Sequence, residues 1–250
     1  MSYSISNIAR EEDYPDVSII MPIYNRNKFK RLILSNILKL DYNKSKIEFC
    51  LYDDGTEPFF IDEKEQEHFI NIIKPITFKY KYDKVKKSIG YKRNALVKLA
   101  THKYIACMDS DDIYMSSYLK HSLNLLLQEK LGLVTSPQML FLYPYKDWKM
   151  TGIDCEVKRM GHEATFVFTK KYFKAMGGFE TNGYGEGVKL IDGMNEKKIG
   201  KTKIDKCMIC ICHKENSVNK ELFLDKGDIE YNLSEYDKSL IKDCLGISDV

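Results

Sequence analysis

The chain has 250 residues, of which 44% are hydrophobic and 30% charged, so it can bury roughly three quarters of the surface that its unfolded form exposes. That composition excludes intrinsic disorder, which goes with low hydrophobicity and a high net charge. The net charge is only +3 and the lysines are scattered, which excludes the clustered basic face typical of nucleic-acid-binding proteins. We therefore expect a globular protein with no nucleic-acid partner.

The cysteines and the first residues indicate the cellular compartment of the protein. The seven cysteines stand mostly inside apolar runs, as Cys50 and Cys107 do, where a free thiol behaves as a small hydrophobic side chain. Cys207 and Cys210 have C-x-x-C spacing, but no second pair of ligands completes a zinc site. The opening MSYSISNIAREEDY is no signal peptide, and no apolar stretch approaches the ~20 residues that span a bilayer. We expect a soluble, cytoplasmic protein without a transmembrane segment.

Strand-like and helix-like segments alternate through the first half of the chain. Val17–Tyr24 is a continuous apolar run, typical of a strand buried on both faces, and Asn27–Leu40 carries an apolar stripe at helical spacing. Similar patterns predict strands at Ile47–Tyr52, Ile76–Tyr82 and Tyr104–Met108, and helices at Asp62–Lys74, Ile89–Ala100 and Ser116–Lys130. This order predicts an α/β fold, with a Rossmann-like, mostly parallel sheet and helices on both faces.

After Leu131 the pattern becomes strand-rich. We expect a short helix at Lys171–Met176 and strands at Leu133–Ser136, Met139–Tyr143, Glu163–Thr169 and Ile204–Cys212. No low-complexity linker interrupts the chain, so residues 1–225 are predicted to form one domain, with a nucleotide-binding half at 14–115 and a strand-rich half at 116–225. Residues 226–250 are polar and are expected to form a peripheral C-terminal tail.

Four polar clusters follow predicted strands or open a predicted helix. They are Pro22–Arg26, Asp53–Thr56, Asp109–Asp112, and Ser88–Gly90, in which Ser88 is the expected N-cap of a helix that carries Arg93 and Asn94. In a doubly wound sheet, ligands bind beyond the carboxyl ends of the strands. The clusters therefore predict one shared site at this rim.

Within this rim, Asp109-Ser110-Asp111-Asp112 is the strongest signal for a metal ion. In extended backbone, residues i and i+2 point to the same side, so Asp109 and Asp111 can face one ion together. Carboxylate oxygens suit Mg²⁺ or Mn²⁺, which also bind a diphosphate. The alternative is an acidic loop that caps backbone N–H groups. Because the motif emerges directly from an apolar strand, the metal site is favoured.

The other clusters suit a nucleotide. Asp53 or Asp54 can accept hydrogen bonds from a base or ribose, although Asp-Gly is also ordinary turn chemistry, and the sequence does not choose between the two acids. Gly90 lets the backbone approach a phosphate at a helix N-terminus. Arg93 can add a charge-assisted bond to that phosphate, or be a solvated charge on its helix.

In their order, these motifs resemble the family-2 glycosyltransferases of the GT-A fold. The matching segments are VSIIMPIYNR (17–26), LYDDGT (51–56), GYKRNALVKLA (90–100), YIACMDSDD (104–112) and GGFETNGYGEGVKLIDGM (177–194). The resemblance implies a nucleotide-sugar donor, commonly a UDP-sugar, bound by residues 14–115. It also implies a divalent metal, Mn²⁺ or Mg²⁺, at the Asp-x-Asp motif, and a hydroxyl acceptor on a glycan, protein or lipid, bound by residues 116–225.

Carried over residue by residue, the resemblance implies specific roles. Asp53 or Asp54 would contact the nucleoside, Arg93 the donor, and Asp109 and Asp111 the diphosphate and the metal. The same motifs contain the remaining donor-binding candidates, which are Pro22, Tyr24, Asn25, Arg26, Gly90, Asn94 and Ser110.

The resemblance is incomplete where the catalytic base is expected. Gly185-Glu186 resembles the start of the family's GED region, but Gly187 replaces the second acid. Glu186 is the first candidate base and Asp192 the second, with surface or capping roles as the alternatives. Similar enzymes often have a metal-binding histidine after the strand that corresponds to Ile204–Cys212, which implies that His213 is a metal ligand. His162 precedes the strand Glu163–Thr169, in a region that lines the acceptor side in such folds. Inversion at the anomeric carbon is the family expectation.

Three other functions deserve comparison. A sugar-nucleotide pyrophosphorylase usually opens with a glycine-rich phosphate loop, and PIYNRNKFK contains no glycine. A non-catalytic nucleotide-sugar or glycan-binding module is consistent with the missing acid at Gly187. An accessory subunit of a larger complex is consistent with the short chain, which leaves little room for an acceptor domain. Of these functions and the glycosyltransferase, we expect the glycosyltransferase.

Overall fold

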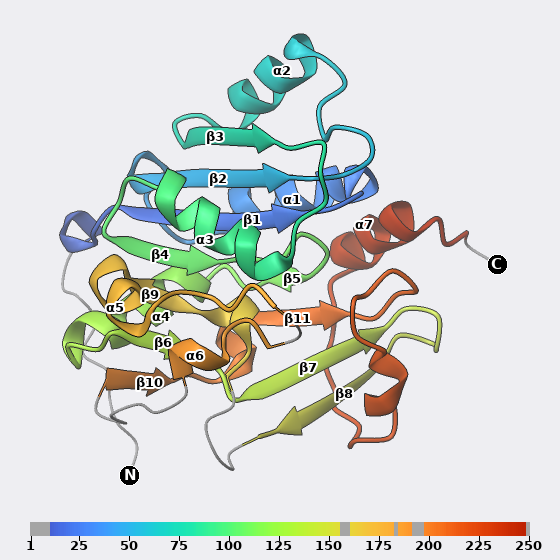
Figure 1. Cartoon of the computed structure of the whole chain (residues 1–250). Coiled ribbons are helices and arrows are strands. Elements are labelled where there is room, and N and C mark those ends of the chain that lie inside the picture. Colours follow the sequence, from blue (N-terminus) through green and yellow to red (C-terminus); the bar gives the residue numbers. More distant parts are fainter. Residues whose placement is uncertain (1–10, 156–160, 183–184, 192–197, 249–250) are drawn as a thin grey trace.

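The main sheet of the protein has seven strands. The computed structural model describes residues 11–155, 161–182, 185–191 and 198–248, and Figure 1 shows their arrangement. The order is β10-β6-β9-β4-β1-β2-β3. The strands are β1 (Val17–Ile23), β2 (Ile47–Asp53), β3 (Thr77–Tyr82), β4 (Tyr104–Cys107), β6 (Leu133–Thr135), β9 (Val167–Thr169) and β10 (Ile199–Lys201). Within this sheet β9 runs antiparallel to both of its neighbours, and the other pairs are parallel.

Helices cover both faces of this sheet, as the alternating strands and helices predicted. They are α1 (Lys30–Lys39), α2 (Glu63–Ile73), α3 (Ile89–Leu99), α4 (Tyr118–Gln128), α5 (Lys170–Met176), α6 (Val188–Ile191) and α7 (Glu235–Leu245). Successive residues of a strand point to opposite faces. Ile19 therefore joins the hydrophobic core under α1 and α4, while Ile20 joins a second core under α3. The continuous apolar run of β1 is explained by burial on both sides.

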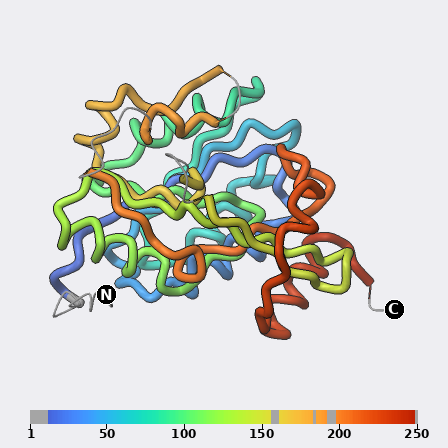
Figure 2. The backbone as a smooth tube through the Cα atoms, turned by 90° about the horizontal axis from the view of Figure 1, so that it is seen from below, coloured from blue at the N-terminus to red at the C-terminus, as the bar shows by residue number. Residues whose placement is uncertain are grey.

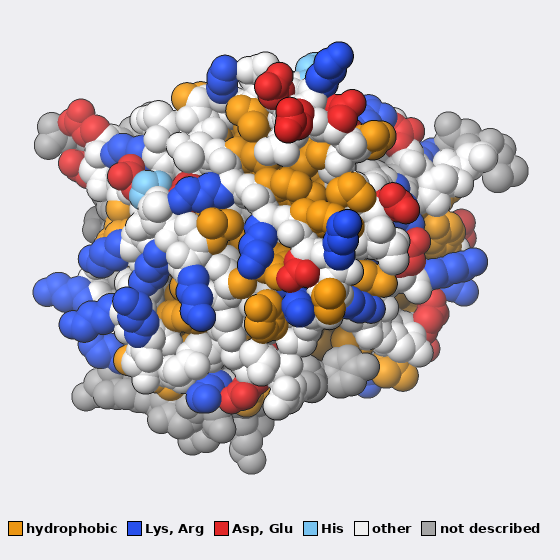
Figure 3. All heavy atoms as spheres, turned by 45° about the horizontal axis from the view of Figure 1, so that its top comes forward, with side chains coloured by type: hydrophobic (Ala, Val, Ile, Leu, Met, Phe, Trp, Pro, Cys, Tyr) orange, Lys and Arg blue, Asp and Glu red, His pale blue; other side chains and the backbone are white. Residues whose placement is uncertain are grey.

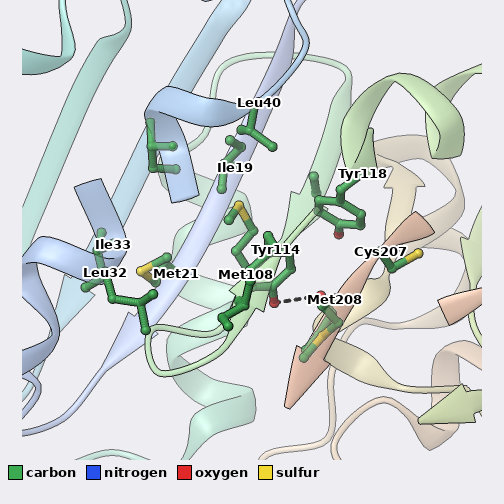
Figure 4. Close-up of a cluster of buried hydrophobic side chains, with 14 of the residues drawn as sticks. Ile19, Met21, Leu32, Ile33, Leu40, Met108, Tyr114, Tyr118, Cys207 and Met208 are labelled. Atoms are coloured by element: carbon green, nitrogen blue, oxygen red, sulfur yellow. Dashed lines mark hydrogen bonds between the residues drawn. The ribbon is translucent and has the colours of Figure 1, made fainter. Parts of the chain in front are cut away.

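A second sheet extends the first at the end of β4. Its order is β5-β11-β7-β8, with β5 (Ile113–Tyr114), β7 (Gln138–Tyr143), β8 (Lys149–Asp154) and β11 (Met208–Ile211). Because β5 begins directly after Asp112, residues 109–112 join the two sheets. Figure 4 shows Tyr114 between Ile19 and Met208, and Tyr118 on the side of Cys207. All five residues belong to one hydrophobic cluster, so both sheets share one core.

Most predicted elements are confirmed within a residue or two, and two strands are corrected. Helix α3 begins where Ser88 accepts a hydrogen bond from the Tyr91 backbone N–H, the predicted N-cap. Glu163–Thr169 and Ile204–Cys212 were predicted as continuous strands, but each opens with a 3₁₀ turn, at Glu163–Thr165 and Ile204–Lys206. In the first turn the His162 side chain caps the Ala164 N–H, which draws the backbone out of extended geometry.

The C-terminal segment ends in a helix that packs on the domain. Helix α7 packs against α1 and buries Leu240, Ile241 and Cys244. Figures 1 and 2 show it beside the tip of the β7–β8 hairpin, where the Tyr145 hydroxyl donates to the Leu245 carbonyl at 3.3 Å. The tail thus lies at the edge of the fold but adds side chains to its core. The division into two functional halves stays a prediction.

The face that Figure 3 shows has side chains of different kinds in different places. Lysine and arginine side chains gather at the lower left of the view, and hydrophobic side chains form a band through its middle. No described helix combines the length and the apolar composition that a bilayer crossing requires.

A buried carboxylate ties the first strands together. Glu48 of β2 is 1% exposed and accepts hydrogen bonds from Ser18 at 2.8 Å and from Thr101, and it forms an ion pair with Lys79 at 2.8 Å. Burial by itself raises the pKa of Glu48, but the hydrogen bonds from Lys79, Thr101 and Ser18 outweigh it and lower the pKa to about 2. The carboxylate is therefore ionised in the folded protein.

We predict that Glu48→Gln lowers the free energy of unfolding by roughly 2 kcal/mol near neutral pH, because the buried ion pair is lost. Since the pKa is depressed from 4.5 in the unfolded chain to about 2, the stabilisation is present above pH 4.5 and is lost as the pH falls toward 2. Urea unfolding near neutral pH and near pH 3 measures both effects. Glu67→Gln, an exposed change on α2, is the matched control. Equal stabilities for wild type and Glu48→Gln would contradict the prediction.

Candidate active site

A cavity of about 1100 Å³ opens at the carboxyl ends of β1 and β4 and the N-terminus of α3. Its other wall comes from the turn at Glu163–Thr165, the segment before α6 and the segment after β11. The predicted site residues that line it are Pro22, Tyr24, Asn25, Arg26, Arg93, Asp109, Ser110, Asp111 and Glu186. The predicted rim is thus one wall of a cavity that spans both sheets.

Arg93 lies at the junction of the two walls. It is 1% exposed, and its guanidinium donates to Asp109 at 2.8 Å and lies 3.2 Å from the Glu186 carboxylate. The Cζ atom of Arg93 lies over the Phe179 ring, 5.7 Å from the ring centre. A buried guanidinium needs opposite charge close by, so Arg93 holds Asp109 on one wall and Glu186 on the other in a fixed relation.

Asp111 is held by two other side chains. Its Oδ2 accepts from Arg26 Nε at 3.1 Å and lies 3.1 Å from His213 Nε2. Burial raises the pKa of Asp111, but the His213 hydrogen bond and the Arg26 charge outweigh it and leave the pKa below its ordinary value. His213 is buried against the Phe29 ring and does not line the cavity itself.

The loop after β4 carries more acid than its neighbours neutralise. Burial raises the pKa of Asp109, although the Arg93 charge offsets part of the rise. Burial raises the pKa of Asp112 further, and the charges of Asp111 and Asp109 add to it. Such concentrated negative charge is stabilised by a cation.

The side chains around Asp111 supply some, but not all, of the ligand atoms that a divalent ion needs. No group of three or more His, Cys, Asp or Glu side chains in the described parts of the chain is arranged to hold a metal by itself. The 3.1 Å between Asp111 Oδ2 and His213 Nε2 is close to the ~3 Å that separates neighbouring ligands of an octahedral ion with bonds of about 2.1 Å. A phosphate ligand would complete such a site, as is usual for Mg²⁺.

Asp53 and Asp54 lie beneath the cavity rather than in its wall. The Asp53 carboxylate accepts from the Gly55 and Phe59 N–H groups at 2.9 and 2.7 Å and from the Tyr80 hydroxyl at 2.9 Å. Asp54 forms a buried ion pair with Lys92 at 2.6 Å and accepts from the Lys87 N–H. Both acids therefore fix the loops that line the cavity, and a contact to a nucleoside stays a prediction.

Gly90 and Asn94 anchor the opposite wall to α3. A Cβ added at Gly90 would lie 1.8 Å from the Glu180 carbonyl oxygen, so glycine is needed for this close approach of two backbones. Asn94 exchanges two hydrogen bonds with the Phe179 backbone, at 2.8 and 2.9 Å. Neither residue lines the cavity. Asp192, the second candidate base, lies outside the described residues.

Two cavity residues had no sequence signal of their own. Glu163 and Lys220 line the wall that faces Arg93 and the Asp109–Asp112 loop. Burial lowers the pKa of Lys220, but neighbouring acidic groups, Cys210 and Asp112 first among them, raise it above its ordinary value. Both residues belong to segments that carried no recognised motif, and the one sequence clue was the missing acid at Gly187.

We predict that Gly90→Ala lowers the free energy of unfolding by about 1–3 kcal/mol, because the new methyl group overlaps the Glu180 carbonyl. Thermal unfolding measures the change. Lys98→Ala, on the exposed side of the same helix, is the control and is expected to be near neutral. A Gly90→Ala protein as stable as wild type would show that the two backbones are not in contact.

Comparisons with known proteins identify sequence relatives of the chain. The sequence profile described as glycosyl transferase family 2 matches residues 18–182. A UDP-Glc:alpha-D-GlcNAc-diphosphoundecaprenol beta-1,3-glucosyltransferase of Escherichia coli, WfgD, is 30% identical over 116 residues, which are 46% of this chain and 43% of that protein. An uncharacterized glycosyltransferase of Haemophilus influenzae is 32% identical over 118 residues, 47% of this chain and 44% of that protein. The chain spans under half the length of these relatives.

Solved structures share the fold at low sequence identity. The mannosyltransferase PcManGT of Pyrobaculum calidifontis, in complex with GDP-Man and Mn²⁺, superposes with a TM-score of 0.63 at 17% identity, over 84% of this chain and 61% of that one. TarS residues 1–349 of S. aureus, in complex with UDP-GlcNAc, give a TM-score of 0.60 at 17% identity, over 80% and 60%. These likenesses confirm the predicted GT-A fold. Since the family profile covers more than half of the sequence, the chain belongs to glycosyl transferase family 2.

Proposed function

We propose that this chain transfers a sugar from a nucleotide-diphosphate donor to a hydroxyl group of a glycan, protein or lipid, with inversion at the anomeric carbon. The observation that carries the proposal is the cavity in which Arg93 links Asp109 to Glu186, beside Asp111, in a domain of this family. A nucleotide diphosphate needs cationic groups, and Arg26, Lys86 and Lys220 line the same cavity.

A UDP-sugar is the proposed donor. The Escherichia coli relative is named for UDP-Glc, and the TarS structure holds UDP-GlcNAc, whereas PcManGT holds GDP-Man. The nucleotide is proposed to lie along the wall that includes Pro22, Tyr24 and Asn25, where the Lys86 ammonium lies 4.0 Å from the centre of the Tyr24 ring. Asp53 and Asp54 support this wall from beneath.

Mn²⁺ or Mg²⁺ is proposed to bind at Asp109, Asp111 and His213. Support comes from the 3.1 Å spacing of Asp111 and His213, from the excess of acid in this loop, and from the Mn²⁺ in the PcManGT complex. A bound divalent ion would neutralise charge on the departing diphosphate.

The chain's own residues would orient the two substrates for an in-line displacement. Arg93 holds the wall that carries Asp109 at a fixed distance from the wall that carries Glu186. The diphosphate is proposed to bind at the first wall, and the acceptor hydroxyl to enter between the two. A carboxylate of the opposite wall, where Glu186 lies, would take the acceptor's proton. All seven cysteines are free, which supports a reducing compartment such as the cytoplasm.

One observation favours a second candidate, a nucleotide-sugar-binding module without turnover. Gly187 stands where the family resemblance implies an acid, and a protein without a base would bind donor but release no product. The two candidates differ in nucleotide diphosphate release.

We predict that Mn²⁺ makes UDP raise the melting temperature, since a ligand at 100 times its Kd adds about 2.7 kcal/mol of stability. Asp111→Asn is expected to abolish the Mn²⁺-dependent part of this shift and to reduce UDP release from a UDP-sugar by about 100-fold or more. The control is Asp41→Asn, whose side chain is 58% exposed. A shift without release on a panel of UDP-sugars would favour the module. No shift and no release would refute a UDP-sugar donor.

A further inference from the structure

The missing acid at position 187 is explained by the neighbour that fills its space. A Cβ added at Gly187 would lie 2.4 Å from Cγ of Glu163 and 2.8 Å from the Phe166 ring. The Gly187 backbone is not in the left-handed region, so space and not conformation excludes a side chain. A carboxylate is thus present at this place, but it comes from a residue 24 positions earlier.

Glu163 is fixed where it faces the cavity. Its Oε1 accepts from the Gly187 N–H at 3.3 Å, and the turn that carries it is capped by His162. Glu163, His162 and Glu186 all line the cavity. This wall of the cavity therefore presents two adjacent carboxylates, those of Glu163 and Glu186. A chain with acidic residues at both positions 186 and 187 would present the same pair of groups.

The two carboxylates have different surroundings. Glu186 is paired with the buried Arg93 guanidinium at 3.2 Å, so a proton on Glu186 would break a buried ion pair. Glu163 has no ion pair of its own among the described residues. Burial raises the pKa of Glu163 and the Glu186 charge adds to this, while Arg93 offsets part of the rise. A carboxylate with a raised pKa is the stronger base.

The adjacent histidine supplies a hydrogen-bond donor. Burial lowers the pKa of His162 to about 3, with the charges of Lys220 and Arg93 adding to this, so the ring is neutral. Its Nδ1 accepts from the Ala164 N–H, so the proton lies on Nε2. That buried Nε2 has no hydrogen-bond partner among the described residues.

We propose that Glu163 is the catalytic base, which replaces an acid at position 187, while Glu186 holds Arg93 in place. As the acceptor oxygen bonds to the anomeric carbon, its proton passes to the Glu163 carboxylate, and the bond from that carbon to the donor's β-phosphate oxygen breaks to release the nucleotide diphosphate. Glu163 then returns the proton to solvent. This assignment rests on the proposed transfer reaction.

The test uses the whole chain, Mn²⁺ and a panel of UDP-sugars, with UDP release as the readout and water or an added sugar alcohol as acceptor. Glu163→Gln is expected to lower kcat by about 100-fold or more while KM for the donor and the UDP-induced shift in melting temperature stay unchanged. The control is Glu180→Gln, an exposed glutamate near the same wall, which is expected to behave as wild type. A kcat within a few-fold of wild type for Glu163→Gln would overturn the proposal.

A second variant separates a chemical role from a structural one. Glu163→Gly removes the carboxylate, and added formate is expected to restore UDP release by about 10-fold or more, because a small external base can enter the vacated space. Absence of rescue, with donor binding intact, would overturn the proposal. If the wild-type protein releases UDP from no donor in the panel, the proposed function itself fails. If the wild-type protein and Glu163→Gln are equally active, the proposed function stands and only the assignment of Glu163 fails.

Discussion

One buried guanidinium organises the site. Arg93 contacts Asp109, which follows the middle of the main sheet, and Glu186, which belongs to the segment before α6. Its charge must be balanced because it is removed from water, and two carboxylates from separate segments balance it. The ion pairs thus set the distance between the wall proposed for the donor and the wall proposed for the acceptor. Helix α3 reinforces this link through Gly90 and Asn94, which hold the backbone near Phe179.

The acidic loop is equally well constrained, because it joins two sheets. The buried Asn36 of α1 donates to the Asp112 carbonyl at 2.7 Å and accepts from the Tyr114 N–H at 3.0 Å. The Tyr114 hydroxyl accepts from the Asp109 N–H at 2.7 Å and donates to the Ala164 carbonyl at 3.0 Å. Tyr114 therefore connects the loop to the turn that carries Glu163. Both walls of the cavity are positioned by one network of buried hydrogen bonds.

Much of the fold was predictable because local patterns and tertiary burial agree. Burial on both faces gave β1 its unbroken apolar run, and the Ser88 cap marked the start of α3. Short or mixed elements were not predictable: β5 has two residues, and α7 buries only three side chains in a polar tail. The carboxylate of Glu163 escaped prediction because its contact with Gly187 joins segments 24 residues apart. The hydrogen bonds that Asp53 and Asp54 make to the loops around them join separate segments and had no sequence signal, and the expected nucleoside contact of Asp53 or Asp54 stays a prediction.

The most direct measurement of the central claim is UDP binding and UDP-sugar turnover by Arg93→Lys. A lysine ammonium keeps the charge but lacks the planar fork that reaches Asp109 and Glu186 together, so both Mn²⁺-dependent UDP affinity and turnover should fall by about 10-fold or more. The control is Arg31→Lys, whose side chain is 70% exposed. If a folded Arg93→Lys protein bound UDP and turned over donor as wild type does, Arg93 would not be the link between the two walls.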